Sequence, residues 1–329
     1  MGRMALAWVT AWPLRYILAV AKLLSELPGA VLFTGNRMVV WWLVLVYAMF
    51  GAAWLISRRR KVRYWIPAAC SVLALCAVLT VNAVQLQRTS TVTALDVSQG
   101  QSIVFSSGRA CAVVDCGGRS TAEDPGDLAA RKLFAQGHRS LDLLVLTHPH
   151  DDHVNGVLRL MHWLPVRTLV IPDAADTTQA PLSDILVLAE ENHTAVVRVD
   201  AERTLTAGGI SVHLYPEPCA GQEDGSMIVL TSIGTYDTLV PGDVDTTAEV
   251  KFLSSCTYPS IELLLVGHHG SKRSTSDVWL DAIAPDAAII SVGYNNYGHP
   301  TAETLERLQA HNIPIYRTDQ MGDITVHLS

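Results

Sequence analysis

The sequence lacks paired cysteines. Its 329 residues include six cysteines, and no two of them form a C-x-x-C pair. A structural zinc site made of two such pairs is therefore excluded. The four cysteines after residue 87 are compatible with one disulfide or with unrelated buried thiols, and their spacing does not choose between the two. Internal repeats and low-complexity segments are also absent, so the chain is not a repeat array.

Acidic residues are almost missing from the first part of the chain and abundant in the rest. Residues 1–87 contain nine Lys or Arg and one acid, Glu26, whereas residues 88–329 contain fifteen Lys or Arg and thirty acids. This contrast indicates two environments. The acidic part cannot bind DNA broadly by phosphate neutralisation, which needs clustered basic residues. Lys272 and Arg273, beside His269, form a local basic patch.

Two long runs contain no charge at all. Residues 39–57 and 64–83 are nineteen and twenty residues long, which is enough for two membrane crossings. Residues 58–63 between them include five cations, and the positive-inside rule places this loop in the cytoplasm. We therefore expect a multi-pass protein of the cell membrane whose residues 88–329 are extracytoplasmic.

The segment before these runs is apolar but less regular. Trp8, Trp12 and Tyr16 recur at helical spacing, which favours an interfacial helix or the remnant of a further span. A signal peptide is disfavoured because no clear cleavage site follows. The predicted organisation is an amphipathic segment over residues 1–38, two membrane helices over 39–87 and a folded domain over 88–329.

The most informative segment is T-H-P-H-D-D-H, residues 147–153. An apolar run typical of a buried strand precedes it, and a helical pattern follows it. Its histidines and Asp152 suit Zn²⁺ or Mn²⁺. His148 and His150 share a face in an extended turn, and Asp152 and His153 can serve an adjacent position, so the motif can begin two metal sites. The alternative, a polar turn with chance histidines, is disfavoured by the number of fixed positions.

Strand and helix patterns alternate beyond residue 88, which predicts an α/β domain with helices covering sheets. The predicted strands are 91–97, 103–105, 112–114, 141–146, 167–172, 195–199, 210–215, 227–232, 238–243, 261–266, 287–292, 314–317 and 323–327, and the predicted helices are 127–136, 154–163, 183–192 and 301–310.

Polar residues collect where these predicted strands end. Besides the T-H-P-H-D-D-H segment they include Asp115, Asp243, His268, His269 and residues 294–299. Strand ends of an α/β sandwich can converge on one edge and build one site. Asp115 before two glycines fits a functional acid or a turn-forming residue equally well. Asp243 is placed to bridge two metal ions.

Residues 148–153 resemble the signature of the metallo-β-lactamase superfamily, and a longer series of segments resembles DNA-internalisation competence proteins of the ComEC type. The segments are 95–100, 114–117, 147–153, 241–243, 266–272, 291–300 and 316–320. The resemblance covers about residues 90–329, and the two apolar runs resemble the end of that family's membrane domain. The chain thus resembles a C-terminal piece or a short form of such a protein.

This resemblance implies a metallo-β-lactamase-like αββα sandwich preceded by transmembrane helices. It implies hydrolysis of DNA phosphodiesters outside the membrane, with one or two divalent ions, Zn or Mn, as cofactors. The implied partners are DNA, as a single or non-transported strand, the membrane, the competence channel and DNA-receptor proteins.

The candidate site residues follow from the motifs and this resemblance together. The metal ligands are His148, His150, Asp152, His153, Asp243 and one of His268 and His269, the other contacting phosphate. The catalytic candidates are Asp152, His269 and His299. The substrate-binding candidates are Ser271, Lys272 and Asn296.

Two departures from the family pattern concern the first metal site. The histidine expected near residues 223–226 has no match, and His213 is a distant substitute. The family's Q-G-D segment is Gln99-Gly100-Gln101 here, so an acid is missing. The first site is therefore weak, filled differently or empty. Two other functions stay open: a non-catalytic module that gates or scaffolds a DNA channel, and a surface metallohydrolase of another phosphodiester.

Overall fold

The computed structural model of the protein describes residues 15–20, 23, 37–58, 61, 63–86, 88–119, 123–216 and 226–328. The chain divides into two compact units, residues 1–35 and 36–329. In the first unit residues 15–20 are helical. Most of the interfacial segment predicted over residues 1–38 lies outside the described residues.

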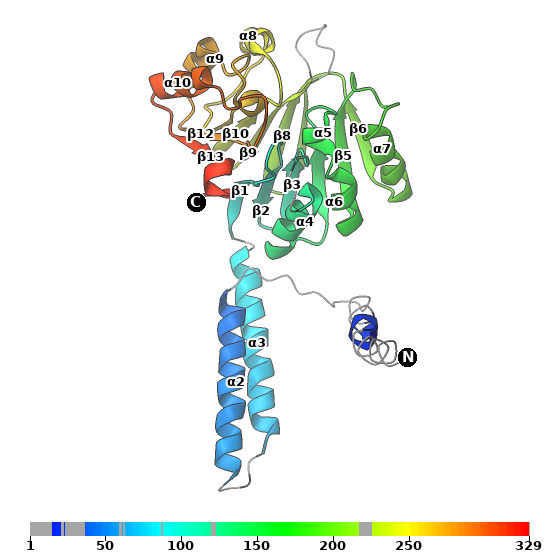
Figure 1. Cartoon of the computed structure of the whole chain (residues 1–329), viewed down its shortest axis with the longest axis vertical. Helices are drawn as coiled ribbons and strands as arrows, with labels where there is room; N and C mark the ends of the chain where they lie inside the picture. Colours follow the sequence, from blue (N-terminus) through cyan, green and yellow to red (C-terminus); the bar gives the residue numbers. More distant parts are fainter. Residues whose placement is uncertain are drawn as a thin grey trace, which may run out of the picture. The chain divides into compact units, whose positions relative to one another are not determined.

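The second unit begins with two apolar helices, α2 (Arg37–Ser57) and α3 (Trp65–Leu86). As predicted, both are long and apolar enough to cross a membrane. They lie side by side (Figure 1), and Trp42 Nε1 donates a hydrogen bond to the carbonyl oxygen of Ser71 at 2.9 Å. This bond matters because an indole N–H facing hydrocarbon would otherwise lack an acceptor.

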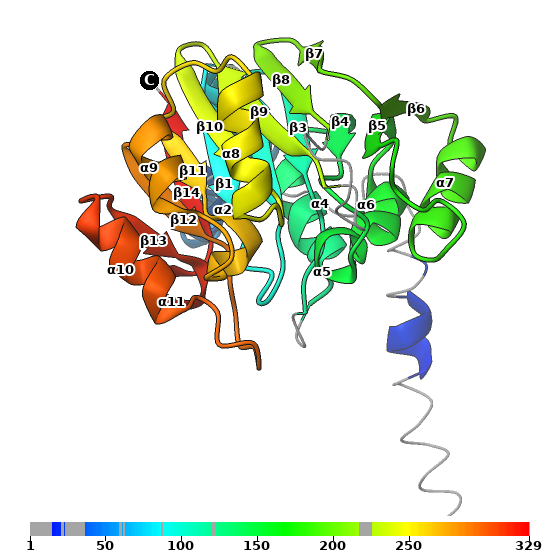
Figure 2. The same cartoon turned by 90° about the horizontal axis from the view of Figure 1, so that it is seen from above.

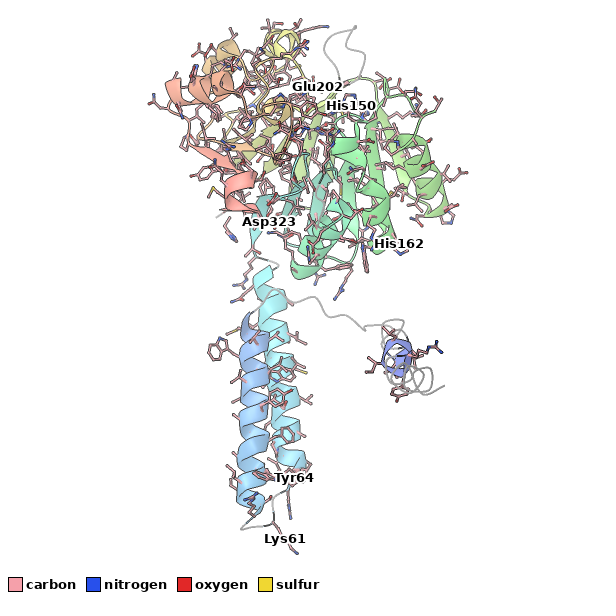
Figure 3. The ribbon with its side chains drawn as sticks, in the orientation of Figure 1. Lys61, Tyr64, His150, His162, Glu202 and Asp323 are labelled. Atoms are coloured by element: carbon pink, nitrogen blue, oxygen red, sulfur yellow. The ribbon has the colours of Figure 1, made fainter. Side chains whose placement is uncertain are left out.

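The turn between α2 and α3 carries part of the predicted basic loop. Lys61 and Tyr64 lie in this turn (Figure 3). The guanidinium of Arg58 lies over the ring of Trp54, 4.1 Å from its centroid. A tryptophan and cations at one end of an apolar helix are typical of a membrane–water interface.

Residues 90–328 form two seven-stranded sheets, A and B. In spatial order, sheet A contains β14 (Ile324–Leu328), β1 (Ser90–Ala94), β2 (Ile103–Ser107), β3 (Ala110–Val114), β4 (Leu141–Val145), β5 (Val166–Pro172) and β6 (Ala195–Val199). Sheet B contains β13 (Ile315–Arg317), β12 (Ala287–Ile290), β11 (Leu263–Leu265), β10 (Tyr236–Val240), β9 (Ile228–Ile233), β8 (Ile210–Tyr215) and β7 (Arg203–Ala207).

Parallel pairing places the functional strand ends together. Strands β3 to β6 of sheet A are parallel to one another, and so are strands β10 to β13 of sheet B. Val114 at the end of β3 pairs with Val145 at the end of β4. The residues that follow these two strands are therefore neighbours, although they are about thirty positions apart in the sequence.

Helices cover the outer faces of both sheets, so the predicted αββα sandwich is confirmed (Figures 1 and 2). On sheet A lie α4 (Pro125–Ala135), α5 (Asp151–Val154), α6 (Val157–Trp163) and α7 (Leu182–Glu191). On sheet B lie α8 (Thr246–Ser255), α9 (Asp277–Ile283) and α10 (Ala302–Ala310). A short helix, α11 (Thr318–Met321), links β13 to β14, and a 3₁₀ turn, η1 (Gly267–Gly270), follows β11.

Apolar side chains fill the spaces between the layers of the sandwich. The layer between the sheets includes Phe105 and Val145 from sheet A and Leu265 from sheet B. The layer between sheet B and its helices includes Phe252 and Trp279, whose ring centroids are 5.4 Å apart. Each fully buried side chain of this size contributes roughly 1.5–3 kcal/mol.

Candidate metal centre

The side chains that can bind a metal gather at one edge of the sandwich. They follow the ends of β4, β10 and β11. A cleft of about 690 Å³ is lined by His150, Asp152, Asp243 and His269, together with His299 from the loop after β12, whereas His148 and His153 are fully buried. His150, labelled in Figure 3, begins helix α5 at this edge. The fold thus brings the ends of these strands together, as the sequence predicted.

Two groups of potential ligands meet there, each with its ligand atoms within 4.8 Å of one another. The first group is His148, His150 and Asp243, and the second is Asp152, His153 and His269. Their donors are imidazole nitrogen and carboxylate oxygen, which suit Zn²⁺ and other divalent metals.

Asp243 lies between the two groups. Its Oδ2 is 3.6 Å from His148 Nε2, and its Oδ1 is 3.3 Å from His153 Nε2. The side chain of Asp243 is 11% exposed and follows Gly242, whose φ of 61° turns the chain sharply after β10. A carboxylate in this position can contact a cation in either group.

Three buried histidines each keep one ring nitrogen free. His269 Nδ1 donates to the carbonyl oxygen of Ser291 at 2.9 Å, and His153 Nδ1 donates to the carboxylate of Asp115 at 2.8 Å. His148 Nδ1 lies 3.1 Å from the hydroxyl of Thr147. In the neutral imidazole, which is the form that binds a metal, these partners leave Nε2 as the atom with a lone pair directed into the site.

Four potential ligand atoms at this site lack a hydrogen-bond partner. Nε2 of His148, His153 and His269 and Oδ1 of Asp243 are buried without a hydrogen-bond partner. Each such atom costs about 1–3 kcal/mol if nothing satisfies it, and buried polar atoms without partners are rare. Four such atoms within the two neighbouring ligand groups fit a site that divalent cations complete.

Asp115 anchors this arrangement from behind. Its carboxylate accepts hydrogen bonds from the backbone N–H of Thr147 at 2.7 Å, from the Thr147 hydroxyl at 2.7 Å and from the Gln101 amide at 2.8 Å, besides the bond from His153. Of the two roles open for Asp115 in the sequence, the functional one fits this geometry. Gln101, where the family pattern has an acid, is a donor to Asp115.

Charges of opposite sign compensate one another in the cluster. Burial opposes ionisation of Asp243, but the neighbouring His153 and His148 hold its pKa well below the usual range. Burial likewise opposes the charged form of His153, yet the carboxylates of Asp243 and Asp115 raise its pKa well above the ordinary value. Burial lowers the pKa of His148, which keeps this imidazole neutral.

Neighbouring loops hold the backbone of the T-H-P-H-D-D-H segment in place by hydrogen bonds and close packing. The N–H of Gln101 donates to the carbonyl oxygen of Asp152 at 2.9 Å, and that of Cys116 donates to His153 at 2.7 Å. Gly117 lies so close that a Cβ atom there would clash with the backbone of Asp152 and His153. Only glycine at position 117 therefore allows the T-H-P-H-D-D-H segment to adopt this conformation.

The two histidines of η1 have different surroundings. Both have left-handed backbone angles, with φ of 50° at His268 and 54° at His269. His269 is buried, and its Nε2 is 3.5 Å from Asp152 Oδ2. The side chain of His268 is 40% exposed, with Nε2 3.6 Å from Asp243 Oδ2. His269 thus belongs to a ligand group, and His268 faces the open cleft.

The remaining predicted residues lie farther out. The ring centroids of His299 and His268 are 5.7 Å apart in the cleft. Asn296 is exposed on the same loop, and Lys272 borders another surface depression, formed with α9 and α10. Ser271 is buried, and its carbonyl oxygen accepts a bond from Thr304 at 3.0 Å. None of these last three is among the described residues that line the cleft.

The lining residues that were not chosen from the sequence as site candidates include Gln99, Arg119 and Tyr297. Gln99 and Arg119 occur in loops beside predicted strands, and a lone cation after two glycines is a weak signal. Tyr297 belongs to the N-N-Y-G-H-P segment, from which Asn296 and His299 were chosen instead.

Some sequence predictions concern other parts of the chain. The region where the family pattern has a further histidine, residues 223–226, lies outside the described residues except for Ser226, which is buried. His213 is on β8, where its Nδ1 lies 2.9 Å from the Thr204 hydroxyl, and it belongs to neither ligand group. The described cysteines, Cys70, Cys76, Cys111, Cys116 and Cys256, are all free thiols.

Comparison with known proteins agrees with this geometry. Residues 95–294 match the family model described as the metallo-beta-lactamase superfamily. The chain belongs to the metallo-β-lactamase superfamily. This metallohydrolase fold implies divalent-metal binding, for which the two ligand groups supply donors. The fold is also similar to that of the CmlA beta-hydroxylase E377D mutant, with a TM-score of 0.50 and 16% identity, covering 73% of this chain and 54% of that one.

Within the superfamily, the sequence is similar to competence proteins. It is 30% identical to ComE operon protein 3 of Bacillus subtilis over 70% of this chain and 32% of that protein. It is 29% identical to Competence protein ComA of Neisseria gonorrhoeae, over 70% of this chain and 31% of that protein. The resemblance to ComEC-type proteins is thereby confirmed, and the chain spans about a third of the length of these curated relatives.

Proposed function

We propose that this metallo-β-lactamase domain hydrolyses phosphodiester bonds of DNA at a centre of one or two divalent ions, Zn²⁺ or Mn²⁺, as part of a membrane DNA-uptake protein. The observation that carries the proposal is the pair of adjacent ligand groups, with Asp243 between them and the Nε2 atoms of His148, His153 and His269 buried without a hydrogen-bond partner. The similarity to competence proteins supports DNA as the substrate.

The ligand groups would hold the ions, and the hydrogen bonds behind them would keep the imidazoles in place. His148, His150 and Asp243 form one position, and Asp152 and His153 with His269 form the other. A divalent ion supplies Lewis-acid polarisation of the phosphoryl group and activation of water. Both positions open on the cleft, where a phosphodiester can reach them.

Proton transfer falls to the residues that face the cleft beside the ligands. His268 is half-exposed, and its ring lies 5.7 Å from that of His299. Burial lowers the pKa of both imidazoles, so near neutral pH each can accept a proton. Either can hold the phosphate or pass a proton to the departing oxygen, since general acid–base catalysis needs such a group within hydrogen-bond reach.

The setting of the reaction follows from charge and topology. The basic turn between α2 and α3 supports an extracytoplasmic position of residues 88–329. The acidic surface of this domain makes wide contact with DNA unfavourable. The strand would therefore contact the domain only at the cleft, or be delivered there by the competence channel and DNA-receptor proteins.

The test is a cleavage assay of the full chain in detergent with linear DNA and Mn²⁺, Zn²⁺ or EDTA. We expect cleavage with at least one of the metals and none in EDTA. Bound metal without cleavage of DNA or of small phosphodiesters would favour the non-catalytic channel module. Cleavage of small phosphodiesters alone would favour a surface hydrolase with another substrate.

A further inference from the structure

A cation and an aromatic ring meet at the mouth of the cleft. Arg119, after β3, donates a hydrogen bond from its guanidinium to the hydroxyl of Tyr297 at 3.2 Å. Its Cζ lies 5.9 Å from the centroid of the tyrosine ring. The two residues are 178 positions apart in the sequence, and both line the cleft with the ligand groups.

The backbone that carries Arg119 is fixed to the metal centre. Asn155, two residues after His153, accepts a hydrogen bond from the N–H of Gly118 at 3.0 Å and donates one to its carbonyl oxygen at 2.8 Å. A Cβ atom at Gly118 would clash with Val97. The Arg119 side chain therefore starts from a defined position beside the ligand motif.

The loop that carries Tyr297 is equally ordered. Asn295 donates to the carbonyl oxygens of Gly293 at 2.9 Å and His299 at 2.8 Å, and it accepts from the N–H groups of Tyr297 and His299 at 3.0 Å each. Tyr297 is nevertheless 59% exposed, and Tyr294 on the same loop is 89% exposed. Large aromatic side chains held outward on an ordered loop form a surface on which a planar group can stack.

The charges of the cleft single out Arg119. Four of the described lining residues are aspartates, Asp151, Asp152, Asp176 and Asp243, and Arg119 is the only Lys or Arg among them. A polyanionic strand entering this cleft beyond the metal ions finds one fixed cation. A guanidinium binds a phosphate with two parallel hydrogen bonds, so it also fixes the orientation of the group.

On the basis of the proposed function, we propose that Arg119 and Tyr297 form a clamp for single-stranded DNA. Arg119 binds the phosphate next to the one at the metal centre, and the ring of Tyr297 stacks on the unpaired base between them. Stacking needs a free base face, which a duplex does not offer. The substrate class of the site is therefore a single strand or an unpaired end.

The clamp is tested by binding. Fluorescence anisotropy follows a labelled single-stranded phosphorothioate oligonucleotide and a blunt duplex of the same sequence, with the full chain in lipid nanodiscs, in Mn²⁺ and in EDTA. We expect Arg119→Gln to lower single-strand affinity about tenfold and to reduce the salt slope by roughly 0.7. Tyr297→Ala lowers single-strand affinity by about tenfold, whereas Tyr297→Phe, which keeps the ring, loses far less.

The matched control is Arg203→Gln, which removes an exposed cation on β7 outside the cleft and should leave both affinities unchanged. Wild-type affinity and salt slope in Arg119→Gln would overturn the clamp. So would absence of single-strand binding in the wild type, or equal losses for duplex and single strand in Tyr297→Ala. Hydrolysis of bis(p-nitrophenyl) phosphate by the wild type tests the proposed function separately, because this ester has neither a second phosphate nor a base.

Discussion

At the scale of single residues, the candidate centre depends on fixed imidazole tautomers. A carbonyl oxygen and an ionised carboxylate cannot donate, so the Nδ1 atoms of His269 and His153 must be the protonated ones. Their Nε2 atoms are then free to bind a cation. Removing such a partner behind a ligand typically lowers metal affinity by roughly 10–100-fold.

His269 and His268 should respond differently to removal. His269→Ala takes a buried ligand from the second group, so we expect the protein to lose one bound ion. His268→Ala leaves both ligand groups intact, so it should keep its metal and lose on the order of a hundredfold in cleavage rate. Elemental analysis of the purified variants, together with cleavage rates, distinguishes the two. Loss of metal in His268→Ala alone would reverse their roles.

Asp115→Asn should affect folding and metal binding together. Asparagine at this position would place an N–H₂ group against the N–H and hydroxyl donors of Thr147, which in the wild type donate to a carboxylate. We expect the free energy of unfolding to fall by roughly 2–4 kcal/mol and zinc affinity to fall by roughly 10–100-fold. Denaturant unfolding and zinc titration measure the two effects.

The control for this variant is Thr147→Ser, which keeps the hydroxyl that bonds to Asp115 and should retain most of the zinc affinity. Unchanged zinc affinity in Asp115→Asn would show that His153 does not depend on this carboxylate.

The sequence predicted the ligands better than the residues that support them. His148, His150, Asp152 and His153 are close in the chain, and their residue types carry the signal of metal binding. The bonds from Asp115 to Gln101 and from Arg119 to Tyr297 join separate loops. Such pairings depend on strand order, which a local pattern does not contain.

At the scale of elements, the fold requires close contact between loops. Gly117→Ala would push a methyl group into the backbone of Asp152 and His153, so we expect a loss of about 2–4 kcal/mol in stability and of metal binding. Gly209→Ala meets only the side chain of Ser107 and is the matched control. Thermal unfolding measures the stability of both variants, and similar melting temperatures in the two would contradict the proposed packing.

Helices α8 and α9 and strand β7 were not predicted from the sequence. Strand β7 is an edge strand with largely exposed residues, so no apolar alternation marks it. The helix predicted over 154–163 is broken instead into α5 and α6. The break occurs because Asn155 bonds to Gly118 and the N–H of Gly156 donates to the carbonyl oxygen of Cys116 at 2.8 Å, contacts that compete with a continuous helix.

At the scale of the whole molecule, topology decides which compartment the cleft faces. The cations between α2 and α3 predict that the sandwich is extracytoplasmic. Protease added to intact protoplasts should therefore release a fragment that begins near residue 90, while a cytoplasmic marker stays protected. A sandwich that is cleaved only after lysis would place it in the cytoplasm and remove it from incoming DNA.

The central claim is that the two ligand groups form one metal centre for DNA hydrolysis, joined by Asp243. The most direct measurement is metal content and cleavage rate of the full chain for the wild type, Asp243→Asn and Asp151→Asn, with melting temperatures in EDTA to confirm folding. Asp151 is exposed and belongs to neither group. We predict that Asp243→Asn loses both metal and cleavage, whereas Asp151→Asn keeps both. Full metal content and rate in Asp243→Asn, or a wild type without metal, would contradict the claim.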